Sequence, residues 1–170
     1  MRVNPLVRRF SRPVKTKTKQ VNSKIPSLLA GVAGEYFVAA ELSRRGYIAS
    51  ISLRNTRGID ILATNAQASR SVTIQCKTSQ LSQGHWILSD KCESFISENH
   101  FYVFVVLGGP LERPRYHIAP SAAVAKHVCD DHRGWLDTPG RRGQAHVDNP
   151  VRNFEDSSNE YLERWDLLGL

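Results

Sequence analysis

Residues 101–107 form an unbroken run of aromatic and aliphatic side chains, Phe-Tyr-Val-Phe-Val-Val-Leu. Aromatic and β-branched residues favour β-strands, and a strand that is apolar at every position is typically buried on both faces. The turn-forming sequence Gly-Gly-Pro follows at residues 108–110. The run therefore predicts a central strand, in a sheet that is covered on both sides.

A helix is expected upstream of this strand, with Ser27 as its N-cap and its end near Gly46. Apolar residues recur there at steps of three and four, which is typical of a helix with one buried stripe. The residues of this stripe are Leu28, Val32, Ala39 and Leu42. Three strand-like runs follow at 47–53, 59–64 and 71–78, and the short turn-rich segments between them predict a meander.

The C-terminal half predicts a further strand at 115–119, a helix at 121–132 and a loop between Trp135 and Pro150. Near the end of the chain a packing helix face is expected. Its residues are Tyr161, Leu162, Trp165 and Leu168. Helices and strands thus alternate in a mixed α/β order, and the length predicts one domain, residues 27–170, after a flexible arm, residues 1–26.

The net charge of +7 is concentrated in this arm. Residues 1–24 carry eight Lys and Arg residues and no acid, whereas the other 146 residues carry 15 basic and 16 acidic groups. Such an arm predicts salt-dependent binding to nucleic acid, and a merely solvated tail is the alternative. The expected contact residues are Arg8, Arg9, Arg12, Lys15, Lys17 and Lys19 in the arm, and Arg57 in the turn between two predicted strands.

No run of eighteen apolar residues and no secretory signal occurs, and three unpaired cysteines suit a reducing compartment. A soluble cytoplasmic protein that does not contact membranes is therefore expected. A homodimer is one assembly that the sequence leaves open.

Two acidic residues interrupt apolar patterns. Glu35 falls on the predicted helical stripe, where a carboxylate calls for a cation or a hydrogen-bonding partner. Asp60 stands in the predicted strand Ile-Asp-Ile-Leu-Ala, although Asp is a poor strand former. Either acid can have a purely structural partner, such as an arginine for Glu35 or the preceding turn for Asp60.

Residues 72–77, Val-Thr-Ile-Gln-Cys-Lys, supply the third element. Alternation along a strand places Gln75 and Lys77 on one face, about 7 Å apart, and turns Cys76 toward the core. One face of this strand is therefore expected to pack and the other to carry chemistry.

The tripeptides Gly58-Ile59-Asp60 and Gln75-Cys76-Lys77, preceded by Gly34-Glu35 in a helix, together resemble the PD-(D/E)XK nuclease superfamily. The resemblance covers about half of the chain. It implies a restriction-endonuclease-like α/β fold, in which a mixed central β-sheet is flanked by helices. A core helix precedes a three-stranded meander, and a helix and a further strand follow it. It also implies a metal-dependent endonuclease that hydrolyses phosphodiester bonds in DNA.

The resemblance further implies a role for each residue. Asp60 would ligate Mg²⁺, for which Mn²⁺ can substitute, and Gln75 and the Cys76 carbonyl would complete the protein ligands. Lys77 would orient or help deprotonate the attacking water. Glu35 would act through a metal-bound water or on a second ion. These roles meet the needs of phosphodiester hydrolysis, which requires charge neutralisation and an activated water.

Gln75 departs from the commoner pattern, which has Asp or Glu at this position. A neutral amide binds Mg²⁺ more weakly than a carboxylate, so the alternative function is a catalytically inactive nucleic-acid-binding protein on the nuclease fold. A basic arm that binds acidic protein partners is a third, weaker hypothesis.

A zinc site at His127, Cys129 and His132 is disfavoured, because their spacing does not match helical i, i+4 neighbours. Trp86 and Trp135 can stack on bases, but packing is the preferred interpretation for both.

Overall fold

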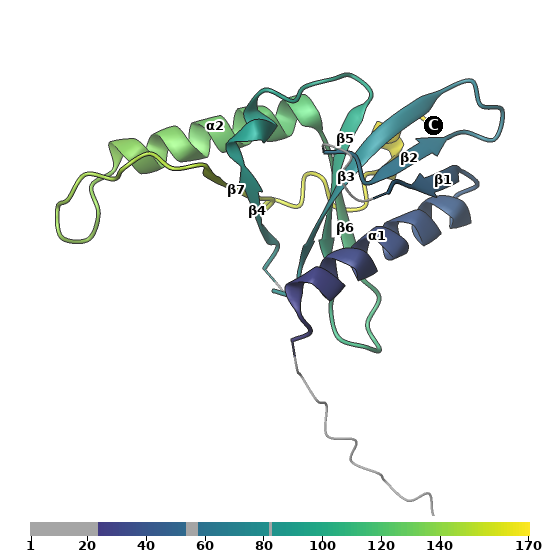
Figure 1. Ribbon diagram of the computed structural model, residues 1–170, viewed down its shortest axis with the longest axis horizontal. Coiled ribbons are helices and arrows are strands. Elements are labelled where there is room, and N and C mark those ends of the chain that lie inside the picture. The colour runs from purple at the N-terminus through teal and green to yellow at the C-terminus, as the bar shows by residue number, and fades with distance from the viewer. Residues whose placement is uncertain (1–23, 54–57, 82) are drawn as a thin grey trace, which may run out of the picture.

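The computed structural model describes residues 24–53, 58–81 and 83–170. Its strands are β1 (Ile48–Ile51), β2 (Ile61–Thr64), β3 (Ser71–Ser79), β4 (His85–Ser89), β5 (His100–Val106), β6 (Arg115–Pro120) and β7 (Val151–Glu155). Its helices are α1 (Ser27–Arg44) and α2 (Ser121–Asp137), and the 3-10 helices are η1 (Asp90–Glu93) and η2 (Trp165–Leu168). Figure 1 shows their arrangement.

Five of the strands form one mixed sheet in the order β1-β2-β3-β5-β6, and β4 pairs with β7 in a separate ribbon. The first three strands are an antiparallel meander, β5 runs parallel to β3, and β6 is antiparallel to β5. The expected meander and mixed central sheet are confirmed. Among the described residues, no helix combines the length and the apolar character that crossing a membrane requires.

The central strand β5 is buried at every position, as predicted. Odd-numbered residues such as Val103 join the core beneath α1, and even-numbered residues such as Phe104 join the core beneath α2 and the β4–β7 ribbon. Both side chains are 0% exposed. The two helices therefore cover different faces of the sheet, as Figure 1 shows.

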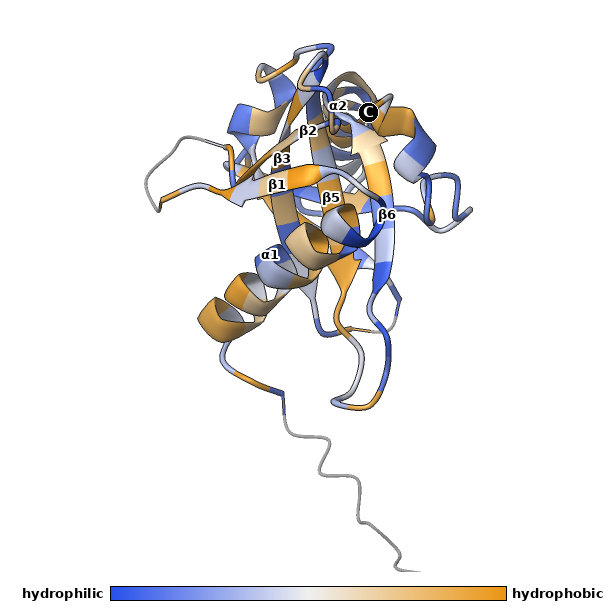
Figure 2. Cartoon of the chain, turned by 90° about the vertical axis from the view of Figure 1, so that its right-hand side faces the viewer, coloured by the Kyte–Doolittle hydropathy of each residue, from blue (hydrophilic) through white to orange (hydrophobic). Residues whose placement is uncertain are grey.

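The predicted stripe of α1 is largely wrong. The helix buries Ala30, Gly34, Val38, Glu41 and Leu42, so Leu42 alone of the predicted stripe is fully buried. Leu28 is 63% exposed, and Figure 2 shows apolar residues on the open side of the first turns. The apolar spacing alone could not locate the buried side, because the first turns of α1 are apolar nearly all round.

The ends of the elements differ from the predictions in three places. Pro26, not Ser27, is the N-cap of α1. The helix expected at 121–132 extends to Asp137, and the unpredicted strand β7 begins directly after the loop expected up to Pro150. The C-terminal packing face is the single 3-10 turn η2, from which Trp165 and Leu168 are buried against β6 and α1.

Glu41 is the glutamate that α1 buries, with 5% of its surface exposed. Its carboxylate forms ion pairs of 3.0 Å with Arg44, Arg45 and Arg113. Arg44 and Arg45 are neighbours of Glu41 on the same helix, but Arg113 lies 72 residues away and could not be predicted from local sequence. The cluster neutralises a buried charge that would otherwise be costly.

Two hydrogen bonds join Ile25, which precedes α1, to Gln80 of the folded body. The Ile25 N–H donates to Gln80 Oε1, and Gln80 Nε2 donates to the Ile25 carbonyl, each at 2.9 Å. Gln80 directly follows β3. The basic arm therefore joins the body at the end of the strand that carries Lys77.

Candidate active site

The candidate site lies where β2 and β3 diverge. The Asp60 N–H donates to the Ile74 carbonyl at 2.8 Å. Two residues further along β3, the Cys76 N–H donates to the side chain of Asp60, at 2.7 Å from Oδ2. The aspartate thus precedes β2, which begins at Ile61, instead of lying within it as predicted. Its side chain takes the place of a backbone acceptor and is held at the fork between the two strands.

Burial raises the pKa of Asp60 above its ordinary value. The hydrogen bond from Cys76 and the positive charge of Lys77 lower the same pKa, but by less than burial raises it. The carboxylate is therefore incompletely compensated by its protein neighbours. A further cation beside it would favour the ionised form.

Three charged groups act on the Cys76 thiol. Burial is the largest cause that raises its pKa well above the ordinary value, followed by the charges of Asp60 and Glu35, while Lys77 lowers it. Since these effects fall off with distance, the structure brings Glu35, Asp60 and Lys77 near one residue. Cys76 itself packs against the core beneath α1, as expected, and its raised pKa makes it a poor nucleophile.

Gly34 sets the position of Glu35. A Cβ at residue 34 would lie 1.9 Å from Thr78 Oγ1, so only glycine allows α1 to approach β3 this closely. Glu35, the next residue along, is half-buried. The close approach brings this turn of α1 against β3, and the charge of Glu35 acts on the Cys76 thiol of that strand.

Gln75 and Lys77 line a cavity of about 620 Å³ on the face of β3 that is opposite to α1. A Cβ at Gly58 would lie 3.9 Å from Gln75 Oε1, so the amide oxygen faces the turn that leads to Asp60. Neither Glu35 nor Asp60 is among the described residues that line the cavity. The four predicted residues therefore surround the fork from two faces of the sheet: Glu35 lies on the α1 side, Asp60 at the fork, and Gln75 and Lys77 on the cavity side.

The backbone of Cys76 also points to the fork. In a strand, the N–H and C=O of one residue project to the same side, and the Cys76 N–H is directed at Asp60. The Cys76 carbonyl is then directed to that side too, beyond the last residue pair that joins β2 to β3.

Within the described ranges, no group of three or more His, Cys, Asp or Glu side chains is arranged so that it could hold a metal ion. Glu35 and Asp60 supply two carboxylates at the fork, and the third side-chain oxygen there belongs to the Gln75 amide. The nucleic-acid contacts predicted at Arg8, Arg9, Arg12, Lys15, Lys17, Lys19 and Arg57 fall outside the residues that the structure describes.

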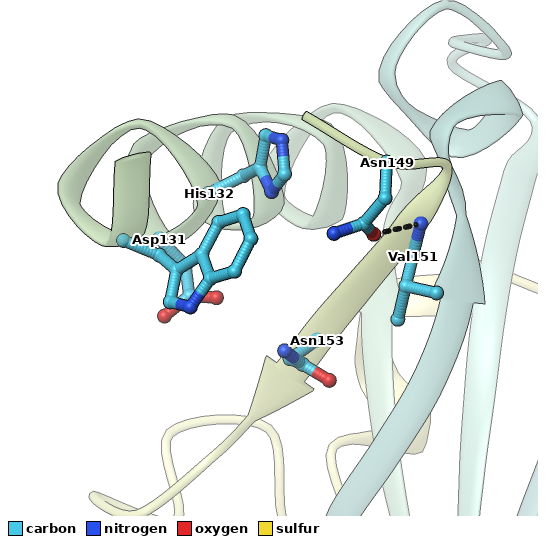
Figure 3. Close-up of a pocket in the computed structure, with 6 residues that line it drawn as sticks. Asp131, His132, Asn149, Val151 and Asn153 are labelled. Atoms are coloured by element: carbon cyan, nitrogen blue, oxygen red, sulfur yellow. Dashed lines mark hydrogen bonds between the residues drawn. The ribbon is translucent and has the colours of Figure 1, made fainter. Parts of the chain in front are cut away.

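The histidines of α2 are engaged in other contacts. His132 Nε2 lies 2.8 Å from Asp148 Oδ1, and the His127 ring packs against Phe154 with centroids 4.8 Å apart. A cavity of about 410 Å³ lies between α2 and β7. Asp131, His132, Asn149, Val151 and Asn153 surround it in Figure 3.

The tryptophans pack, as preferred from the sequence. Trp86 is 2% exposed and donates its indole N–H to the Val105 carbonyl at 3.1 Å. Trp135 is 37% exposed and stacks on His146, with centroids 4.2 Å apart. Stacking of Trp135 on a nucleobase would therefore have to compete with this histidine.

The order and direction of α1, the β1–β3 meander and the parallel strand β5 reproduce the core that the resemblance implies, and the motif residues lie on both faces of the sheet around its fork. The fold is restriction-endonuclease-like. One element differs from the implied core. A helix is expected between the meander and the next strand, but the segment between β3 and β5 holds β4 and the short helix η1, and the long helix α2 follows β6.

No protein-family model matches the sequence, and no curated protein matches it. Among solved structures, a bacterial homing endonuclease is similar over 85% of this chain and 92% of its own, at 15% identity and a TM-score of 0.49. A Holliday junction resolvase from the archaeal hyperthermophile Archaeoglobus fulgidus is similar over 82% of this chain and 95% of its own, at 14% identity and a TM-score of 0.48.

Proposed function

We propose that this protein is a metal-dependent endonuclease that hydrolyses phosphodiester bonds in DNA, with Mg²⁺ as its metal. The observation that carries the proposal is the position of Asp60, whose carboxylate is held by the Cys76 N–H at the fork and carries a raised pKa. A buried and undercompensated carboxylate beside a lysine is typical of a functional site.

The donor set fits Mg²⁺, which prefers hard oxygen ligands. Asp60, Gln75 and the Cys76 carbonyl would hold the ion, and Glu35 would act through one of its bound waters. When bound, the ion would neutralise charge on the phosphate and lower the pKa of a bound water. Mn²⁺ has similar ligand preferences and would substitute.

Lys77 would act on the attacking water and on the phosphate. Its positive charge lowers the pKa of Asp60, and it directly follows Cys76 in β3, which supports a place beside the proposed ligands. It would orient the water, help to remove its proton and offset charge as the transition state forms.

Cleavage by the Lys77→Ala variant tests this role. We expect the variant to fold and to bind DNA within a few-fold of wild type, but to lose on the order of a hundredfold or more of the cleavage rate, as general acid–base residues do. Plasmid, single-stranded, flap and junction DNA would be incubated with Mg²⁺ or Mn²⁺ and resolved on gels. Cutting at the wild-type rate would exclude the assigned role of Lys77.

The second candidate function is DNA binding without turnover, which the neutral Gln75 amide favours. Compared with Asp or Glu at this position, the Gln75 amide gives the ligand set one negative charge fewer, and Mg²⁺ binding is weaker. If neither metal produces cleavage of any substrate in the panel, and the Asp60→Asn variant binds DNA as wild type does, this candidate replaces the nuclease.

We further propose that the basic arm supplies much of the DNA affinity, since the remainder of the chain is nearly neutral. Deletion of residues 1–24 removes eight cations and should weaken DNA binding and flatten its dependence on salt. Binding isotherms over a series of salt concentrations measure both effects. An unchanged salt slope would show that the arm does not contact phosphates.

A further inference from the structure

The cavity beside Gln75 and Lys77 has a wall that the sequence motifs do not include. Its floor comes from β3 and β5, and its wall from the end of β4, from η1 and from the residues that follow. The described residues that line it are Gly58, Gln75, Lys77, Leu88, Ser89, Lys91, Cys92, Ser94, Phe95 and Tyr102. Polar and apolar groups are thus combined in one enclosure next to the fork.

The charge of the cavity is positive. Lys77 and Lys91 line it from two different elements, and no acidic residue is among its described lining residues. Gln75, Ser89 and Ser94 add groups that can donate hydrogen bonds. This combination suits an anionic ligand with several acceptor oxygens, such as a phosphate.

The wall also has an apolar part, which a phosphate group alone would not contact. Phe95 is 40% exposed, although it lines a cavity. Its ring is fixed from two sides: His100 meets it edge to face with centroids 4.5 Å apart, and a Cβ at Gly58 would lie 3.2 Å from it. A fixed, exposed ring beside cations is a stacking surface for a nucleobase.

His100 supports this surface without adding charge. It is 1% exposed, and burial lowers its pKa to about 4, so that it is neutral at physiological pH. Its Nδ1 lies 2.8 Å from Thr73 Oγ1, while its Nε2 has no hydrogen-bond partner among the described residues. Phe95 and Tyr102, which both line the cavity, pack on this ring. The aromatic wall is therefore backed by a neutral, buried group.

The size of the cavity selects the form of the ligand. A volume of about 620 Å³ lies within the range of pockets that enclose small organic molecules. It suits one nucleotide, whereas a double helix presents its bases in paired stacks that cannot enter such a space without unpairing.

We propose that this cavity receives one unpaired nucleotide of a DNA strand, with its base against Phe95 and its phosphate between Lys77 and Lys91. The inference rests on the proposed function, because it assigns the substrate class of the same site. The preferred substrate is then DNA with a single-stranded extension, flap or extruded base rather than a blunt duplex.

Equilibrium binding without metal tests the inference separately from cleavage. A fluorescein-labelled blunt duplex and the same duplex with an unpaired extension would be titrated with the full-length protein in EDTA, and anisotropy recorded. Wild type is expected to prefer the extended DNA. Phe95→Ala should weaken binding to the extended DNA about tenfold and leave the blunt duplex unaffected, and Phe95→Tyr, which keeps the ring, should restore the preference.

The chain offers matched controls. Ile96 is 54% exposed, follows Phe95 directly and does not line the cavity, so Ile96→Ala should bind both DNAs as wild type does. Lys91→Gln should weaken binding to the extended DNA several-fold more than Lys126→Gln, which removes an exposed charge on α2. Thermal melting of each variant checks that it is folded.

Each outcome decides between the two proposals. Equal affinity of wild type for both DNAs, or a Phe95→Ala loss that is the same for both, would overturn the inference about the cavity. A preference for extended DNA without cleavage in any metal would keep this inference and remove the nuclease proposal. Cleavage without such a preference would keep the nuclease and remove the cavity.

Discussion

The Asp60→Asn variant is expected to lose DNA cleavage on the order of a thousandfold while its melting temperature stays equal to, or rises above, that of the wild type. The loss follows because asparagine offers the metal a dipole where aspartate offers a full charge. The hydrogen bond from the Cys76 N–H is expected to survive, since the amide oxygen accepts as the carboxylate does.

The effect on stability follows from the direction of the pKa shift. Folding raises the pKa of Asp60 through burial, so the native state binds the proton more tightly than the unfolded chain does. Stability is therefore lost as the pH rises from the ordinary Asp value through the raised value, and the full penalty is reached above the raised value. Asparagine carries no charge and avoids this penalty.

Melting temperatures of wild type and Asp60→Asn, recorded at several pH values with and without Mg²⁺, test the prediction. At neutral pH without metal, Asp60→Asn should melt no lower than wild type, and the difference should disappear below the ordinary Asp pKa, where Asp60 is protonated in both states. Mg²⁺ should raise the melting temperature of wild type alone, because only wild type binds it well.

The exposed residue Asp130 provides the control, since its surface pair with Lys126 should contribute little to stability. Asp130→Asn should cleave DNA at the wild-type rate. Undiminished cleavage by Asp60→Asn would refute metal ligation by Asp60, and a large drop in its melting temperature would assign this residue a structural role instead.

The Gly34→Ala variant is expected to lose about 2 to 3 kcal/mol of unfolding free energy, as overpacked sites do. Alanine favours helices over glycine by about 1 kcal/mol, but here the added Cβ would meet Thr78 Oγ1 at 1.9 Å. The clash forces α1 away from β3 and moves Glu35 with it. Urea unfolding measures the loss, and a parallel drop in cleavage is expected from the displaced carboxylate.

Gly31, one turn earlier in the same helix, is the matched control. Nothing lies within 4 Å of a Cβ at this position, so Gly31→Ala should raise the unfolding free energy by about 0.5 to 1 kcal/mol. Thr78→Ala should partly rescue Gly34→Ala, because it removes the clashing oxygen. Independent, additive effects of the two substitutions would show that residues 34 and 78 do not meet.

The fold could be predicted from the sequence wherever a local pattern is compatible with only one kind of structure. The apolar run in β5 required cover on both faces, and the two cores provide it. The stripe of α1 was misplaced because several of its sides are apolar, and only contact with β3 selects the side that carries Gly34 and Val38. The ribbon of β4 and β7 was missed because its strands are five residues long and pair across more than sixty residues of chain.

The candidate site likewise has features that could be predicted from the sequence and features that depend on how the strands pair. Motif spacing could identify Asp60, Gln75 and Lys77 as candidates, but the hydrogen bond that holds Asp60 depends on the register between β2 and β3 and leaves no mark in the sequence. Lys91 and Phe95 were not predicted, since a short polar segment around η1 carries no periodic signal. Pairing of β4 with β7 brings this segment over the cavity.

The turn η2 has a consequence for how the protein is made. Leu168 and Trp165 fill the core beneath α1, although α1 is the first element of the folded body to be synthesised. A nascent chain that already includes α1 and the whole five-stranded sheet therefore exposes an apolar surface beneath α1. This surface stays exposed until residue 168 leaves the ribosome. Growing chains that stall before this point should be clients for chaperones, because they expose the surface that the last turn covers.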